Sequence, residues 1–253
     1  MDLKSLPFFL HNDNIRTIFQ DVVACLWDDV EAYLVSGAIR NSLVYKLLGE
    51  ELPWRDYDVV VVQWQEEFVQ RLQNKGFSFT DGHLKGMSHG AILRRPKFPN
   101  PKKMIDYVYL DLIFSSKSSF IQRNMESPNF TLNGAALSLG EIFAADRYEK
   151  LIVLPTTIAD IQNKQIRVNN AGGSTNIYAC LRFMHLGFAP PLQEEVQALL
   201  QSWREITKGR FERNIKKLTD YVWGMDRARE LARELGVWED LFVRPGDSLS
   251  SWA

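Results

Sequence analysis

The chain has 253 residues, enough to bury a sizeable core as one large domain or two small ones. Apolar residues make up 45% of it and charged residues 24%, as in ordinary globular proteins. Lys and Arg number 30 against 31 Asp and Glu; the resulting formal net charge of −1 argues against a broad nucleic-acid-binding surface, but not against a local basic groove.

The sequence has the features of a cytoplasmic protein. Its two cysteines, Cys25 and Cys180, lie in apolar helical patterns, which favours buried thiols in a reducing compartment over a disulfide scaffold. The N-terminal region lacks a basic segment followed by an apolar run, and no stretch approaches the length of a membrane span. We therefore expect a cytoplasmic location and no membrane partner.

The first part of the chain predicts helices alternating with strands. Apolar residues recur at helical spacing over residues 14–30, which predicts an amphipathic helix. Residues 33–35 predict a short strand that ends at Ser36-Gly37, and the following helix is expected to stop at Gly49. The next predicted strand covers residues 56–62.

Two carboxylates stand at the start of that strand. Because side chains in a strand alternate between faces, Asp56 and Asp58 are expected to project on the same side. They would repel each other unless a cation lies between them, and Mg²⁺ takes such oxygen ligands together with substrate phosphates. The spacing is thus consistent with a metal site for phosphoryl transfer, and equally with two solvated acids at a strand end.

A helix ending at Gly76 and three strands, at residues 77–80, 89–93 and 104–114, are predicted next. Residues 94–103 carry five cations and three prolines, which predicts a loop between the last two strands. Its cations are interpreted either as contacts to a polyanionic ligand or as a solvated hairpin tip.

Asp111 lies in the apolar segment 108–113 of the last predicted strand. A lone acid in such a strand is costly unless it is paired, hydrogen-bonded or metal-bound, so both a site role and a structural role are open. Asp106 is expected on the opposite face, at the exposed end of the strand, and is not assigned to the site.

After residue 150 the pattern becomes helical. Apolar stripes at residues 196–206, 211–222 and 226–235 predict packing faces of helices. We therefore predict an α+β fold: a head domain at residues 1–150, with a mixed β-sheet flanked by helices, followed by a small all-helical neck and C-terminal domain at residues 151–253.

Five short motifs occur in a fixed order along the chain. The first is a strand–turn–helix, Leu34-Val35-Ser36-Gly37-Ala38-Ile39-Arg40-Asn41, and the second is an Asp-x-Asp strand, Asp56-Tyr57-Asp58. The third is a His-Gly strand, His89-Gly90-Ala91-Ile92-Leu93, and the fourth is a Phe-Thr-x-Asn segment, Pro128-Asn129-Phe130-Thr131-Leu132-Asn133-Gly134-Ala135-Ala136-Leu137. The fifth is the end of a neck helix, Arg182-Phe183-Met184-His185-Leu186-Gly187-Phe188. Together they resemble the head domain of the class II tRNA nucleotidyltransferase/poly(A) polymerase family, within the DNA polymerase beta-like nucleotidyltransferase superfamily.

The resemblance implies a Mg²⁺-dependent enzyme. It would transfer NMP from an NTP, expected to be ATP, to a hydroxyl acceptor, for which the family implies an RNA 3′-end. It implies that the catalytic metal ligands are Asp56, Asp58 and Asp111, with Asp111 also able to accept the nucleophile's proton. It implies nucleotide-binding roles for Ser36, Gly37, Arg40, Asn133 and Arg182, whereas His89 is expected to be structural.

The chain also departs from the family pattern. Ser36 replaces a glycine, Asn41 and Asn129 replace aspartates, and residues 171–176 stand where the family has the base-selecting Glu-Asp-Pro-x-Arg motif. The part after the neck motif is also shorter than the family's tRNA-gripping body and tail. Two further hypotheses therefore stay open: transfer to a small molecule or protein, and a catalytically degenerate domain that binds a nucleotide or a partner. An unrelated α/β enzyme with fortuitous motifs is a third.

Overall fold

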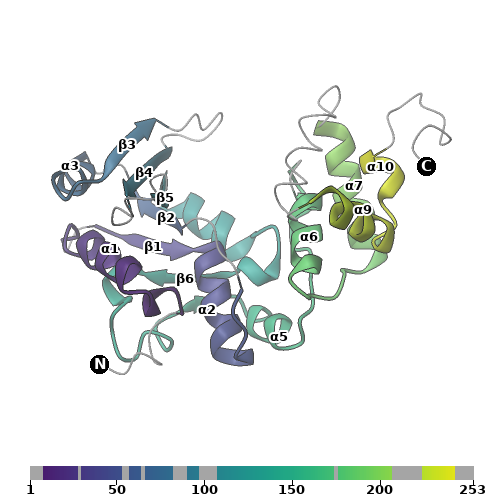
Figure 1. Cartoon of the computed structure of the whole chain (residues 1–253), viewed down its shortest axis with the longest axis horizontal. Coiled ribbons are helices and arrows are strands. Elements are labelled where there is room, and N and C mark those ends of the chain that lie inside the picture. Colours follow the sequence, from purple (N-terminus) through teal and green to yellow (C-terminus); the bar gives the residue numbers. More distant parts are fainter. Residues whose placement is uncertain are drawn as a thin grey trace, which may run out of the picture. The chain divides into compact units, whose positions relative to one another are not determined.

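The computed structural model describes residues 8–27, 30–52, 57–63, 66–81, 90–96, 107–173, 176–206 and 224–242. The chain forms two compact units, the first from residues 1–128 and 132–162 and the second from residues 129–131 and 163–253. Residues 151–162 thus belong to the first unit; the domain boundary predicted after residue 150 remains a prediction. Figure 1 shows both units, coloured along the sequence.

The first unit is built on a mixed seven-stranded sheet with the order β3-β4-β5-β2-β1-β6-β7. Strands β2 and β5 are parallel, and the other neighbours are antiparallel. The strands are β1 (Ala32–Val35), β2 (Tyr57–Val62), β3 (Ser78–Asp81), β4 (Gly90–Pro96), β5 (Tyr107–Ser115), β6 (Ala135–Ser138) and β7 (Ile152–Val153). The mixed sheet with flanking helices, followed by a helical region, confirms the predicted fold class.

The helices, in chain order, are η2 (Phe8–His11), α1 (Asp13–Val23), α2 (Ser36–Leu48), α3 (Glu66–Asn74), α4 (Lys117–Phe120), η3 (Ile121–Glu126), η4 (Thr131–Asn133), η5 (Leu139–Glu141), α5 (Thr157–Gln162), α6 (Asn176–His185), α7 (Gln193–Ile206), α9 (Met225–Glu234) and α10 (Trp238–Phe242). Within the described residues, none of them is both long and apolar enough to cross a membrane.

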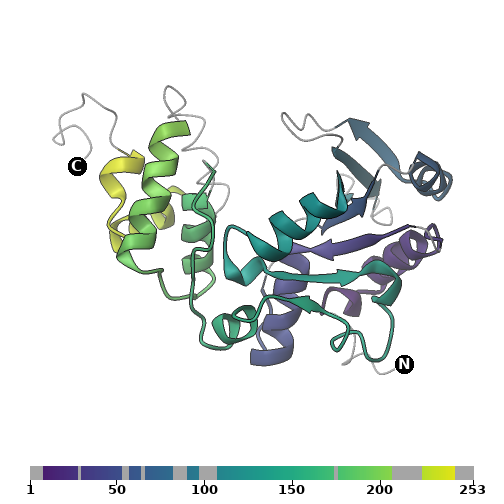
Figure 2. The same ribbon diagram turned by 180° about the vertical axis from the view of Figure 1, so that it is seen from behind.

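The two faces of the sheet are covered by different elements. On one face the Tyr57 ring contacts Phe9 of η2 and Phe19 of α1, with centroids 5.3 and 5.1 Å away. On the other face Phe120 and Met125, from α4 and η3, belong to one core cluster with Val35, Val60 and Ala136 of the central strands. The reverse view in Figure 2 shows this teal helical segment in front of the strands. The central strands are therefore covered on both faces of the sheet, and successive side chains along a strand pack alternately on one face and the other.

The first helix is shorter than predicted. The Asn12 side chain caps α1 by accepting hydrogen bonds from the Asn14 and Ile15 amides at 3.0 and 3.3 Å. The helix ends at Val23, not near residue 30, because the Cys25 amide bonds to Val22 O, three residues back, and begins a turn. That turn buries Cys25 and leads to the buried Val30. Apolar periodicity alone does not distinguish such a turn from one more helical turn.

Strand β4 is longer than predicted. Its pairing with β5 continues through Arg94, Arg95 and Pro96, which the sequence assigned to a loop. Pro96 is the last residue of the strand and lies beyond the residues of β4 that pair with β3, so this end of β4 has a partner strand on one side. The rest of the predicted basic loop, residues 97–103, lies outside the described residues.

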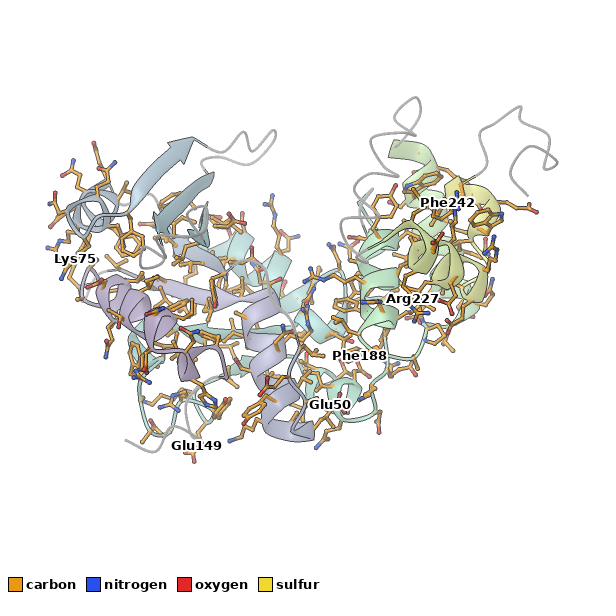
Figure 3. The ribbon with its side chains drawn as sticks, in the orientation of Figure 1. Glu50, Lys75, Glu149, Phe188, Arg227 and Phe242 are labelled. Atoms are coloured by element: carbon orange, nitrogen blue, oxygen red, sulfur yellow. The ribbon has the colours of Figure 1, made fainter. Side chains whose placement is uncertain are left out.

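The second unit is a set of helices around a small core. The buried Trp203 Nε1 of α7 donates to the Tyr178 hydroxyl of α6 at 2.8 Å, and the Trp238 and Phe242 rings stack at 4.7 Å; Figure 3 labels Phe242. Cys180 of α6 is buried and free, as is Cys25 of the first unit, as the sequence predicted. The stripe predicted at residues 211–222 lies outside the described residues.

Candidate functional site

The structure places Asp58 and Asp111 opposite each other on neighbouring strands. They are register partners in the parallel β2–β5 pair, and both side chains are partly buried. Adjacent strands lie about 4.8 Å apart, so their side chains emerge side by side on one face of the sheet. Like charges in such a pair destabilise the sheet unless a cation neutralises them. Asp56, the third predicted ligand, lies outside the described residues.

The turn from β1 into α2 lies beside this pair. Val35, the last residue of β1, is the register partner of Asp58, and α2 begins at the next residue, Ser36. Ser36 has φ 61°, in the left-handed region where a side chain other than glycine's costs energy. Val35 occupies the N-cap position and makes no side-chain cap bond. The first amides of α2 therefore have the arrangement that favours an anion, next to the carboxylates.

Arg40 is folded back toward the start of α2. Its side chain is buried, and Nη1 donates to Asn133 Oδ1 at 2.7 Å while Nε donates to Asn41 Oδ1 at 3.2 Å. A Cβ placed on Gly37 would lie 3.6 Å from Arg40 Nη2, so the guanidinium reaches the Ser36-Gly37 turn. The predicted residues Gly37, Arg40 and Asn133 thus form one cluster.

Asn41, which replaces a family aspartate, is a structural part of this cluster. It is 1% exposed, and its Nδ2 donates to the Leu52 carbonyl at 3.4 Å. An aspartate has no such donor. The amide at this position therefore ties α2 to the segment that leads into β2.

Arg182 and Asn129 belong to the second unit. Arg182 lies on α6, and its predicted role in nucleotide binding remains a prediction. Asn129 Nδ2 donates to Asn176 Oδ1 at 3.0 Å, and the Asn176 amide in turn donates to the carbonyls of Asn170 and Gly172 at 3.3 and 2.6 Å. These bonds hold the loop that stands where the family has its base-selecting motif.

Restoring the family residue at position 129 is therefore expected to destabilise the second unit. In Asn129→Asp a carboxylate would face Asn176 Oδ1, and Asn176 cannot reverse its amide without losing the bonds to Asn170 and Gly172. We expect a loss of about 1 kcal/mol, the cost of an unsatisfied polar group. Denaturant titration followed by tryptophan fluorescence and circular dichroism measures it, with Asn163→Asp at an exposed position as control. Equal stability of the two variants would show that the Asn129–Asn176 hydrogen bond contributes nothing to the free energy of unfolding.

One feature of the site was not anticipated from the sequence. Residues 121–126 form a π-helix, in which the Ser127 amide donates to Gln122 O, five residues back, at 2.7 Å. Phe120, which directly precedes this segment, and Met125 within it pack on Val35 and Val60, on the sheet face from which Asp58 projects. π-Helical turns are rare and frequent at functional sites. The one signal of the π-helix in the sequence is the spacing of five residues between the apolar Phe120 and Met125.

The described part of the site fits a divalent metal in its chemistry. Asp58 and Asp111 supply carboxylate oxygens, which Mg²⁺ prefers, and substrate phosphates and water usually complete its shell. Among the described residues no group of three His, Cys, Asp or Glu is arranged to hold a metal ion. A site with three protein carboxylates would need Asp56, which lies outside them.

Comparison of the sequence with protein-family models finds no match, and comparison with curated proteins finds none either. Comparison of the fold with solved structures finds clear similarity. A tRNA-processing enzyme (apo form I) is 23% identical, with a TM-score of 0.62 over 94% of this chain and 61% of that one. A CCA-adding enzyme in complex with ATP is 18% identical, with a TM-score of 0.59 over 94% and 55%.

The CCA-adding enzyme of Thermotoga maritima, complexed with tRNA, is also 18% identical, with a TM-score of 0.58 over 96% of this chain and 55% of that one. The chain therefore spans somewhat more than half the length of these enzymes. It has the head-and-neck fold of the CCA-adding and tRNA-processing enzymes, the fold that its ordered motifs predicted.

Proposed function

We propose that this protein is a Mg²⁺-dependent nucleotidyltransferase that moves NMP from an NTP to the 3′-hydroxyl of an RNA and releases pyrophosphate. One observation carries the proposal: Asp58 and Asp111 face each other on β2 and β5, directly beside the start of α2, where Arg40 lies. A cation site next to an anion site is what a metal–triphosphate complex requires.

Each group has a part in that chemistry. Asp58 and Asp111, with Asp56, would hold Mg²⁺, which when bound neutralises phosphate charge and aligns the attacking and leaving oxygens. The first amides of α2 and the Arg40 guanidinium would bind phosphate oxygens. The acceptor oxygen forms a bond to the α-phosphorus while the bond to pyrophosphate breaks, and we assign Asp111 as acceptor of the hydroxyl proton. For Arg182, contact with the nucleotide remains a proposal that rests on the family resemblance alone.

The choice of ATP and RNA is supported by the structures that share the fold. They include CCA-adding enzymes in complexes with ATP, with CTP and with tRNA. The loop held by Asn176 has no charged pair corresponding to the family's base-selecting motif. We therefore propose ATP as donor without assigning a CCA-type order of addition.

The test is a transfer assay with each of the four α-labelled NTPs, Mg²⁺ and tRNA lacking its 3′-terminal nucleotides. Label from ATP is expected in the RNA band, and EDTA is expected to abolish it. In a parallel experiment the protein is incubated with cell extract and the labelled NTPs. The products are then separated by size into RNA, protein and small molecules, and the label in each fraction is measured. Label in protein or metabolites would overturn the proposal that RNA is the acceptor. Absence of label from every fraction would overturn the proposal that the protein is a nucleotidyltransferase.

A domain that binds a nucleotide without turnover is the second candidate. It is favoured by the position of Asn41, a neutral residue that replaces a family aspartate and bonds directly to Arg40. Calorimetric titration with ATP separates the two functions. A transferase should bind ATP more tightly with Mg²⁺ than with EDTA, whereas a domain without a metal site should show no such difference.

A further inference from the structure

Two arginines that the sequence assigned to a basic loop are instead part of strand β4. Arg94 is the register partner of Tyr109, which lies two residues before Asp111 on β5. Positions directly opposite each other in an antiparallel pair share one face of the sheet, and successive positions in a strand alternate between faces. Arg94 is therefore on the sheet face of Asp111 and Asp58, whereas the next residue, Arg95, is on the opposite face.

Strand β3 continues this alternation at the end of the sheet. Ser78 is the register partner of Arg94, Thr80 lies two residues further on, and Phe79 stands between them. Such alternation of polar and apolar residues is typical of a sheet with one packed and one solvated face. Figure 1 shows β3 and β4 at the end of the sheet away from β6. At that end, the face that bears the carboxylate pair thus has two hydroxyl residues and a cation.

The strand order separates β4 from the proposed triphosphate site. The start of α2 follows β1, on one side of the Asp58–Asp111 pair, and β4 lies on the other side. Nucleotidyl transfer is an in-line displacement, in which the attacking and leaving oxygens are on opposite sides of the phosphorus. With the triphosphate bound at α2, pyrophosphate leaves toward that helix, and the attacking hydroxyl enters from the side of β5 and β4. Asp111, proposed to accept the proton of that hydroxyl, is the carboxylate on this side.

We propose that Arg94 binds the RNA acceptor at the phosphodiester that precedes its terminal 3′-hydroxyl. Diagonal neighbours across a strand pair are about 7–8 Å apart, a distance that long side chains span, and Arg94 is a diagonal neighbour of Asp111. A cation at this position offsets the repulsion that the two carboxylates exert on RNA phosphates. The proposal rests on the proposed function and adds to it a residue that binds the acceptor.

The first test compares Arg94→Gln with Arg95→Gln. Binding of fluorescently labelled tRNA that lacks its 3′-terminal nucleotides is measured by anisotropy over a range of salt concentrations, with Mg²⁺ and without NTP. Arg94→Gln is expected to weaken binding about tenfold at low salt, the effect of losing one hydrogen bond to a charged group. The slope of log K against log salt concentration should fall by about 0.7, the value for one phosphate of a single strand. Arg95→Gln removes the same charge from the opposite face and should change neither quantity; equal effects of the two variants would overturn the proposal.

A modified RNA identifies the phosphate. Replacing the last phosphodiester of the acceptor by a neutral methylphosphonate should weaken binding to the wild type by about the same factor as Arg94→Gln. The same replacement should have little further effect on Arg94→Gln, because the two changes remove one interaction. A full additional loss in the variant would show that Arg94 and this phosphate act independently, and the proposal would fail.

Other roles of Arg94 have different signatures, each of which would contradict the proposal. A residue that serves the triphosphate would, when replaced by glutamine, weaken ATP binding and leave RNA binding unchanged. A residue that serves only the carboxylates would change the Mg²⁺ concentration that transfer requires, again without an effect on RNA. Arg94→Lys keeps the charge and should retain the salt slope of the wild type; loss of the slope in this variant too would attribute the effect to folding.

Failure of the proposed function is recognised separately. In that case the wild type transfers no nucleotide to any acceptor, whatever Arg94→Gln does to RNA binding. The anisotropy measurements need no transfer, so they report on Arg94 alone.

Discussion

Asp58→Asn is expected to reduce nucleotide transfer by about 10²–10³-fold, the usual cost of removing one group that stabilises transition-state charge. Asp58 faces Asp111 across the β2–β5 pair, so the substitution removes half of the described carboxylate site while preserving its shape. Single-turnover transfer at saturating ATP and Mg²⁺ measures the effect on the chemical step. Binding of triphosphate in EDTA should change little or increase slightly, because a negative charge is lost near the anion site.

The same variant should keep the wild-type fold, because asparagine has nearly the same size and shape as the aspartate that it replaces in β2. Thermal unfolding of the same preparation tests this. Glu149→Gln, which removes an exposed carboxylate elsewhere in the first unit, is the matched control and should affect neither property; Figure 3 labels Glu149. A variant that loses activity and stability together would instead identify Asp58 as a structural residue.

Gly134→Ala is expected to lower the free energy of unfolding of the first unit by about 3 kcal/mol, at the upper end of the cost of overpacking. An added Cβ would lie 2.4 Å from Leu154 Cδ1 and 2.7 Å from Thr157 Oγ1, closer than atoms can approach. The Gly134 carbonyl also accepts from the Leu154 amide at 2.8 Å and from Thr157 Oγ1 at 3.3 Å. A shift to relieve the clash would strain those bonds.

Thermal denaturation measures this effect, with an expected decrease of about 6–12 °C for a chain of this size. Gly140→Ala is the control, because its added Cβ would lie 3.7 Å from Ser138 Oγ, an ordinary contact, on an exposed residue. It should change stability by less than about 0.5 kcal/mol. If Gly134→Ala were as stable as the wild type, the segment of Leu154 and Thr157 would have to be more adaptable than its contacts indicate.

Local features of the fold were predictable from the sequence. Gly49 ends α2 in the left-handed conformation, φ 72°, that a helix stop at glycine implies. Alternation along the strand placed Asp58 on the side opposite to Tyr57 and Val59, and the structure buries Tyr57 against Phe19 on that other face. Errors arose at the ends of elements: a turn follows Val23 where the helix was predicted to continue, and β4 continues through Pro96 where a loop was predicted.

The sequence by itself determined the element types, the alternation of the strands and the ordered motifs, because these depend on neighbours within a few residues. It did not determine that Asp58 faces Asp111 or that Arg40 bonds to Asn133 and Asn129 to Asn176. Those pairs depend on strand register and on packing between distant segments, which local propensity does not encode. Only the tertiary structure decided that the side-chain amides at 129 and 133 are each bonded to a protein partner, Asn176 and Arg40 respectively.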